Sequence, residues 1–523
     1  MSLVLWSWIF LALYIGGMLA LGFIGHRRVK QADDFATARG SYGPVFLALA
    51  FAATTASGAT FLGNPGLAYE WGLSTVWSNF LYPMGVYFGV LLSMRIVAKS
   101  GNRFGNRSIP EYLGDRYQSE GIRVLVSLFS LVLFFYVAGQ LVSGLVMFET
   151  MLGLPPMWAL IITTAVLLVY VVLGGAHADI LTDGAQGFMM LVLAVVVIVL
   201  FVFGVGAEGG MMGVIENLGG QDENLVGPLN PDTPLYHSWW SIIAIFLAHI
   251  PLGLLPHLGN KLWALKDITR QKTFIKLAFT FGIVLGMMGL GGLLSRALLG
   301  ESLYGEGSNP NESLPMLFIE LFPTWLVALI GMSILAAIMS TADGLVISSS
   351  QIIANDLYRR SIVPRLKNAL EGDALDRRVL TISRVSSVLV LLICMGMAWM
   401  LMDTNIALIV WIGNGGMMAA FAGPLIVGAL WQGVTRYGAY SGLVGGFSTF
   451  CVLYMQLLDP SWFGPGVLQD ILAWLSAEGP NPFSCAALGE LVSVAVTFTV
   501  SKFTQPLPEA HVEELFGKAA YRS

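Results

Sequence analysis

Long uncharged runs of apolar residues recur along almost the whole chain, and they constrain its fold more than any other feature. A run of about 20 apolar residues is long enough to cross the hydrocarbon core of a bilayer as one helix. Only 11% of the 523 residues are charged, against about 25% in soluble proteins. The sequence therefore predicts an all-α polytopic membrane protein with about thirteen spanning helices, near residues 4–24, 43–69, 74–98, 121–150, 156–173, 180–205, 237–258, 274–298, 314–352, 379–402, 404–428, 437–457 and 485–504.

Basic residues are distributed unevenly between the loops that join these runs. Lys and Arg are enriched in cytoplasmic loops. If the N-terminus lies outside, the outer loops hold no Lys or Arg, whereas the inner loops carry clusters such as Lys261, Lys266, Arg270 and Lys272. Arg296, at a helix end, is the one basic residue on the outer side. This pattern predicts a multi-pass protein of the plasma (inner) membrane, with the N-terminus outside and the C-terminus in the cytoplasm.

The run 314–352 is too long for one straight crossing, and its second part is unusually polar. Within Leu335–Tyr358, Ser340 and Thr341 are adjacent and Asp343 follows. An acid near the middle of a membrane costs at least about 2.5–3.5 kcal/mol on insertion scales. Hydroxyl and carboxyl oxygens are the ligands that small hard cations prefer, but small residues also permit close helix packing. Composition alone leaves both interpretations open.

Two predicted helices contain residues that interrupt a helix. The second carries Ala-Ala-Thr-Thr-Ala-Ser-Gly-Ala at 52–59 and Gly-Asn-Pro-Gly at 63–66, and the seventh carries His-Ile-Pro-Leu-Gly at 249–253 and then Pro256. Unwound backbone at membrane depth is tolerated where it lines a cavity or is buried in protein. Interrupted helices in both halves of a chain indicate a transporter with inverted repeats, although no strong residue-level repeat is visible here.

Other polar residues in the apolar runs are candidates for a binding cavity. Asp179, Asp183 and Gln186 share one helix face,; we expect Asp179 to be solvated at the inner end and Asp183 to lie deeper, with an ion-related role. A His in a membrane could relay protons or be neutral and line the cavity. Packing is the alternative role for each candidate solute-binding residue: Thr54, Thr55, Ser57, Tyr136, Gln140, His249, Trp411 and Asn414.

The chain resembles the sodium:solute symporter family, which includes the sodium/proline, sodium/pantothenate and sodium/glucose transporters. The resemblance runs from about residue 6 to 455 and rests on the segments DDFATARG, TTASGATFLGNPG, SIPEYLGDRY, LGGAHADILTDGAQ and, above all, AAIMSTADGLVISSSQIIANDLY. The chain departs from the family at Ala176, where a larger apolar residue normally follows the Gly pair, and at His177 and Asp179. These departures make the inner end of the sixth helix harder to predict.

The resemblance implies a LeuT-like core of two inverted five-helix repeats. We accordingly divide the chain into a first helix and loop (1–42), a first repeat (43–206), an outer loop (207–236), a second repeat (237–428), two peripheral helices (429–505) and a cytoplasmic tail (506–523). The family also implies a primary sodium site formed by the carbonyls of Ala53, Ala56 and Ala337 and the hydroxyls of Ser340 and Thr341. A second ion site of Asp183, Ser340 and Asp343 is left open, because Asp343 stands where the relatives that bind a second ion have Ser.

The function that this resemblance implies is secondary active transport, in which inward Na⁺ movement drives uptake of a small solute. The segment around Thr55 is more similar to the pantothenate and monocarboxylate transporters than to the sugar transporters, which favours a small organic anion. A sodium/amino acid (proline-like) symporter and a proton-coupled symporter that uses Asp183, Asp343 and His249 are the alternatives. We expect Na⁺ as coupling ion, no organic cofactor, no enzymatic activity, and a small solute and the lipid bilayer as partners, with neither nucleic acid nor an obligatory protein partner.

Overall fold

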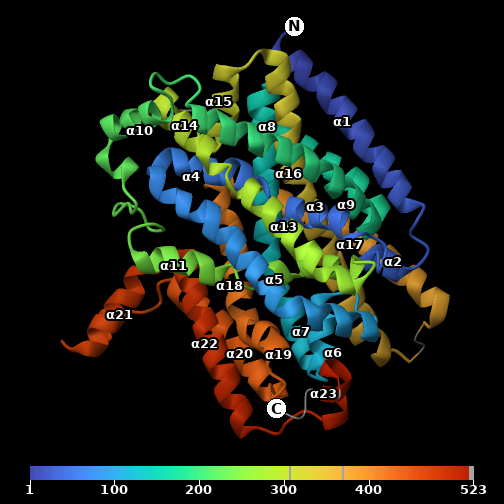
Figure 1. The fold of residues 1–523 in the computed structure, drawn as a ribbon. Coiled ribbons are helices and arrows are strands. Elements are labelled where there is room, and N and C mark those ends of the chain that lie inside the picture. The colour runs from blue at the N-terminus through green and yellow to red at the C-terminus, as the bar shows by residue number, and fades with distance from the viewer. Residues whose placement is uncertain (306–307, 368–369, 518–523) are drawn as a thin grey trace.

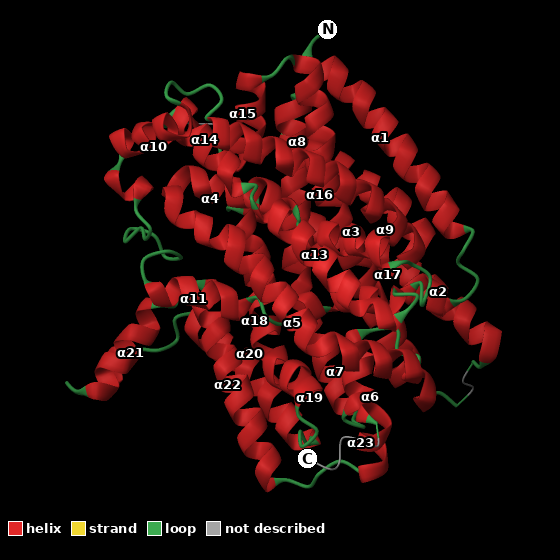
Figure 2. Cartoon of the chain, in the orientation of Figure 1, coloured by secondary structure: helices red, strands yellow, loops and turns green. Residues whose placement is uncertain are grey.

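The computed structural model describes residues 1–305, 308–367 and 370–517, and the regular elements of this part of the chain are helices (Figures 1 and 2). The last six residues of the predicted tail lie outside it. The first half contains α1 (Leu3–His26), α2 (Ala32–Thr37), α3 (Pro44–Thr55), η1 (Ala59–Gly63), α4 (Asn64–Trp71), η2 (Gly72–Thr75), α5 (Val76–Phe104), α6 (Ile109–Arg116), α7 (Glu120–Phe129), η3 (Ser130–Val132), α8 (Leu133–Leu152), α9 (Pro156–Phe203), α10 (Gly210–Gln221) and η4 (Glu223–Val226).

The second half continues the same all-helical pattern. It contains α11 (Trp239–Ala248), η5 (Leu252–Leu254), α12 (Pro256–Gly259), η6 (Asn260–Ala264), η7 (Ile268–Arg270), α13 (Gln271–Gly286), α14 (Gly289–Leu299), η8 (Ser302–Tyr304), η9 (Pro310–Glu312), α15 (Ser313–Leu321), α16 (Thr324–Gln351), η10 (Ile352–Ile362), η11 (Val363–Arg365), α17 (Gly372–Leu401), α18 (Ile406–Phe421), η12 (Ala422–Val427), α19 (Gly428–Leu430), α20 (Arg436–Tyr454), η13 (Pro460–Trp462), α21 (Val467–Ala477), α22 (Pro482–Phe503) and α23 (Glu509–Phe516).

The number of membrane crossings can be compared with the sequence prediction. Nine helices of the described residues are long and apolar enough to span a bilayer, or ten when α11 and the segment after it, bent by 52°, count as one broken span. Three further predicted spans coincide with α3, the first part of α9 and α20, which are shorter or less apolar. The count of thirteen crossings therefore stays a prediction.

Two irregularities expected from the sequence have clear backbone causes. The run 314–352 divides into α15 and α16, because Phe322 is extended and Pro323 precedes the new helix. Within α9, Gly175 has φ 54° and ψ −156°, a conformation open mainly to glycine. This kink separates the two predicted helices 156–173 and 180–205.

The interrupted first helix lies in the middle of the bundle. The helices α3, α9 and α16 contact one another, and they lie together near the centre of Figure 1, whereas α20, α21 and α22 lie to one side. Every residue of α16 from Ile334 to Gln351 is buried, so the polar stretch that the sequence singled out faces protein on all sides. The buried position of this stretch lets its hydroxyl and carboxyl groups meet polar groups of α3 and α9.

Candidate functional site

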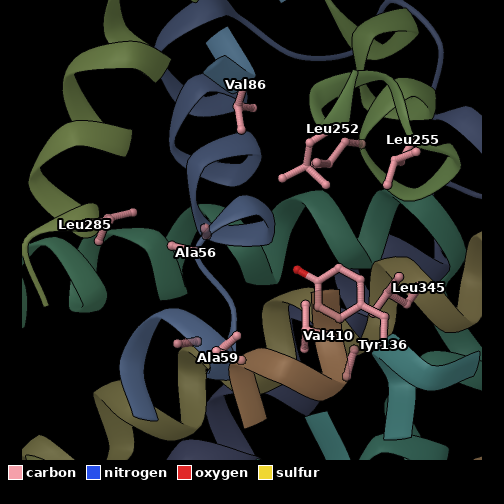
Figure 3. Packing of buried hydrophobic residues seen from close by; sticks show 14 of the residues in the cluster. Ala56, Ala59, Val86, Tyr136, Leu252, Leu255, Leu285, Leu345 and Val410 are labelled. Atoms are coloured by element: carbon pink, nitrogen blue, oxygen red, sulfur yellow. The ribbon is translucent and has the colours of Figure 1, made fainter. Parts of the chain in front are cut away.

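The first interrupted helix breaks at Ala56–Gly58, between α3 and η1. Ala56 has φ −87° and ψ 86°, outside the helical range. The hydroxyl of Tyr82 donates to the Thr55 carbonyl at 2.5 Å, and the backbone N–H of Gly58 donates to Gln140 Oε1 at 2.9 Å. Figure 3 shows Ala56 and Ala59 on either side of the non-helical link, with the Tyr136 hydroxyl pointing towards it. Side chains of neighbouring helices thus satisfy backbone groups that the break releases.

The hydroxyl groups of α16 reach the last carbonyls of α3. Ser340 Oγ lies 3.0 Å from the Ala53 carbonyl oxygen and 3.1 Å from that of Ala337. Thr341 Oγ1 lies 2.8 Å from the Thr54 carbonyl oxygen and 3.4 Å from that of Ala337. Both hydroxyls are fully buried. Four of the five oxygen atoms expected to bind sodium are thereby linked, and the fifth, the Ala56 carbonyl, belongs to the break itself. A cation here would compete with these hydroxyl protons for the carbonyl oxygens.

A cluster of three carboxyl groups lies beside these oxygens. Asp179 and Asp183 come from α9 and Asp343 from α16, and one oxygen of each lies within 4.8 Å of the others. Asp179 is only 4% exposed, so the prediction that it is solvated is wrong. The kink at Gly175 turns this end of α9 inward, over Phe35 of α2. Asp183 and Asp343, two of the three residues that the family resemblance left open as a second ion site, thus belong to a larger acidic cluster.

The ammonium group of Lys261 lies inside this acidic cluster. Its Nζ is 2.8 Å from Asp179 Oδ2 and 2.6 Å from Thr54 Oγ1, and it also contacts Asp183 Oδ2. Thr54 Oγ1 in turn donates to Asp183 Oδ2 at 2.6 Å. A lysine buried among carboxylates forms ion pairs that would be strongly destabilising to break by removing one partner.

Lys261 corrects the sequence analysis, which assigned it to an inner loop. The second interrupted helix continues through α12 and η6, and the Lys261 side chain is only 4% exposed. The topology prediction assumed that every basic residue between two predicted helices is solvated. The useful signal was the apolar surroundings of Lys261, in the sequence LGNKLWAL, together with two acids in α9 that required a positive partner,.

An uncharged cavity lies on the opposite side of the break from the acidic cluster. It is lined by aromatic, apolar and neutral polar residues, among them Ser57, Thr60, Tyr82, Tyr136, His249, Trp411, Asn414 and Phe483. The space open to a water-sized molecule is about 20 Å³, roughly enough for one water. The cavity must therefore widen to admit a solute.

Five of the eight residues expected to bind solute line this cavity, and three do not. Thr54 faces Lys261 instead, Thr55 Oγ1 donates to the Phe51 carbonyl at 2.8 Å, and Gln140 binds the backbone of Gly58. Tyr82 and Phe483 also line the cavity, although their sequence positions did not predict it. Tyr82 lies in an ordinary-looking apolar run, and Phe483 comes from a helix that we had placed at the periphery.

His249 has a defined hydrogen-bonding role in the cavity. Its Nδ1 lies 2.5 Å from the Ile245 carbonyl oxygen, and since a carbonyl only accepts, Nδ1 carries the proton. The ring packs against Tyr82 and Phe483, at centroid distances of 4.8 and 5.0 Å. Nε2 is buried and has no partner among the described residues. When the ring is neutral, Nε2 is therefore an acceptor available to a solute.

Two interrupted helices that meet at buried polar groups inside a bundle of apolar helices are typical of ion-coupled secondary transporters. A model of the sodium:solute symporter family matches residues 35–446, and the chain belongs to this family. The predicted class of protein, a multi-span membrane transporter rather than an enzyme, is thereby confirmed.

Individual relatives support the same family. The chain is 25% identical to the high-affinity proline transporter PutP of Bacillus subtilis, over 92% of this chain and 98% of that protein. It is 28% identical to the sodium/pantothenate symporter of Escherichia coli, over 83% of this chain and 88% of that protein. Its identity to a sodium/proline symporter of Staphylococcus aureus is 27%, over 97% and 94% of the two chains.

Solved structures confirm the predicted LeuT-like fold. The structure of a Na⁺-coupled sialic acid symporter, bound to substrate in an outward-open state, matches with a TM-score of 0.73 at 19% identity and covers 96% of this chain and 99% of that one. Mhp1, a nucleobase-cation-symport-1 family transporter in a closed conformation, matches with a TM-score of 0.55 at 14% identity, over 92% and 98% of the chains.

Proposed function

We propose that this protein couples inward Na⁺ movement to uptake of a small solute across the plasma membrane, with its N-terminus outside and its C-terminus in the cytoplasm. The observation that carries the proposal is the convergence of the Ser340 and Thr341 hydroxyls on the carbonyls at the end of α3. Membership of the sodium:solute symporter family and similarity to proline and pantothenate symporters support it. Na⁺ is the coupling ion in this account.

The solute is a small organic anion, such as a monocarboxylate or pantothenate. The half-helix formed by η1 and α4 begins at Ala59, beside the cavity, and the positive end of its dipole favours a carboxylate. The lining residues themselves are uncharged. The free acceptor at His249 Nε2 further favours a solute that carries an N–H or O–H group, as pantothenate does.

An amino acid is the second candidate solute, and the same His249 acceptor favours it. The ammonium group of an amino acid would donate to Nε2 while its carboxylate faces the start of η1. Similarity to proline transporters along nearly the whole chain also supports this candidate.

Coupling follows from the position of the ion between two helices. Na⁺ bound to α3 and α16 would hold them in the arrangement that also forms the solute cavity beside the break. Two ligands that favour the same state increase each other's affinity by the same factor. The membrane potential contributes about 2.3 kcal/mol per charge per 100 mV to inward movement of the ion.

Uptake into proteoliposomes tests this function. Radiolabelled pantothenate, lactate and proline are offered separately under an inward Na⁺ gradient, an inward K⁺ gradient, or no gradient. We expect one of them to accumulate only with the Na⁺ gradient. Ser340→Ala should strongly reduce this accumulation, and Ser387→Ala, which removes a buried hydroxyl that bonds the Ser383 carbonyl within α17, should preserve it. Uptake that persists without Na⁺ but fails at high external pH would contradict Na⁺ coupling and support proton coupling.

A further inference from the structure

We propose that Lys261 is a resident cation that occupies a second cation position, so that the transporter binds a single Na⁺ from solution in each cycle. This inference rests on the Na⁺ site proposed above. It assigns a role to Lys261 and its ion pairs, which belong neither to the solute cavity nor to the primary ion site.

The acidic cluster has the composition of a cation site. Oxygen atoms of Asp179, Asp183 and Asp343 lie within 4.8 Å of one another, and the three side chains are at most 5% exposed. Ionised carboxylates gathered at this spacing in a buried position are stabilised by a positive charge between them. Within the described chain, Lys261 supplies that charge, with its Nζ against Asp179, Asp183 and Thr54.

A free Na⁺ and the ammonium group would compete for the same place. Asp183 Oδ2 already accepts from both Lys261 and Thr54. Two cations sharing one carboxylate oxygen in a buried site would repel each other strongly. The lysine therefore excludes a second Na⁺ as long as its side chain stays in the cluster.

The cluster nevertheless retains unused acceptors. Asp179 Oδ1, Asp183 Oδ1 and Asp343 Oδ2 are buried and have no hydrogen-bond partner among the described residues. Three carboxyl groups thus face one ammonium group. If the ammonium is removed, these oxygens form a set of hard ligands for a small cation.

Thr54 connects this cluster to the primary ion site. Its carbonyl accepts from Thr341 Oγ1 at 2.8 Å, and its hydroxyl bonds Lys261 and Asp183. Because Lys261 belongs to η6, the last part of the second interrupted helix, its charge moves with the protein and is never released. The transporter thereby keeps the charge balance of a two-cation site while transporting one ion.

Equilibrium binding of ²²Na⁺ to the purified, detergent-solubilised full-length protein tests the proposal without a known solute. We expect one Na⁺ per wild-type chain and a Hill coefficient near 1. Lys261→Ala should bind two, with a Hill coefficient that rises towards 2. Lys261→Arg, which retains a cation, and Lys266→Ala, which removes an exposed lysine five residues further on, should both bind one.

A second variant keeps the test decisive if Lys261→Ala does not fold. Asp179→Asn combined with Lys261→Ala removes both members of the 2.8 Å ion pair and leaves Asp183, Asp343 and Ser340, and it should also bind two Na⁺. Two ions bound by the wild type, or one ion bound by folded Lys261→Ala or by the folded double variant, would overturn the resident-cation proposal and leave Na⁺ coupling intact. If the wild type shows no saturable Na⁺ binding at all, the proposed primary site is overturned as well.

Discussion

The two interrupted helices of this transporter differ in what their breaks contain. The first breaks at Ala56, Ser57 and Gly58, which have small side chains, and hydroxyls of α16 lie against the carbonyls just before it. The second bends by 52° in a segment that contains Pro251 and Pro256, and it brings His249 and Lys261 to the centre of the bundle.

One architecture thereby holds exchangeable and fixed charge side by side. A break made of small residues presents backbone oxygens, which bind a cation only when one arrives from solution. In the second break, Pro251 and Pro256 have no backbone N–H to donate, and the same segment carries a long side chain with its own positive charge.

Removing the fixed charge should have the largest effect on stability. In KCl buffer, Lys261→Ala should lose about 3–5 kcal/mol in the free energy of unfolding, because the variant leaves buried carboxylates without their partner. Thermal denaturation in detergent measures this loss, with Lys266→Ala as the control. If the emptied position accepts Na⁺, replacing KCl by NaCl should recover part of the lost stability. A variant as stable as the wild type in KCl would contradict the ion pairing.

Removing the hydroxyls at the exchangeable site should weaken Na⁺ binding without a comparable loss of stability. Ser340→Ala and Thr341→Val should each lower the affinity for Na⁺ about 10- to 100-fold, the range expected when one group bonded to a charge is lost. Tryptophan fluorescence during a NaCl titration measures the dissociation constant. Ser387→Ala should titrate like the wild type. Unchanged affinity in both hydroxyl variants would place the ion elsewhere.

Removing the hydrogen-bond acceptor that His249 provides at the second break should weaken solute binding and leave Na⁺ binding unchanged. His249→Phe keeps an aromatic ring between Tyr82 and Phe483 but loses Nε2, so solute affinity should fall about 2- to 10-fold, the effect of one hydrogen bond. Na⁺ affinity, measured on the same preparation, should stay the same. A parallel loss of Na⁺ affinity would mean that the two breaks are not functionally separate.

The smallest effect is expected at η9, which packs against α4 beyond the first break. Burial raises the pKa of Glu312 to about 7, and the nearby Glu149 adds to the shift. Because the folded protein holds this proton more tightly than the unfolded chain, stability should decrease as the pH rises from about 4.5 through 7. Glu312→Gln should therefore raise the melting temperature by about 1–2 °C at pH 8 and leave it unchanged at pH 4.5. An equal shift at both pH values would rule out this ionisation.

The sequence predicted the all-helical membrane architecture and both breaks, because apolar run length and the positions of Gly and Pro act locally. It also singled out Ser340 and Thr341, since hydroxyls are conspicuous in an apolar helix. It failed at Lys261, because the rule that assigns basic residues to inner loops holds no information on which one folds back into the bundle.

The directions in which side chains point around the first break were equally hard to predict. Thr54 and Ser57 are three residues apart, yet one faces the acidic cluster and the other the solute cavity. Helical periodicity does not continue through a break, so spacing alone cannot assign a face. Phe483 of α22 reaches this cavity through tertiary packing that no local pattern encodes.

If the first break, closed by α16, is a Na⁺ site, the thermal stability of the wild type should depend on which cation is present. Melting temperatures are measured in increasing NaCl, KCl or choline chloride at constant ionic strength. Because a ligand that binds the native state raises stability by mass action, we predict a saturable increase with Na⁺ and none with K⁺ or choline. Identical curves in NaCl and KCl would contradict the account.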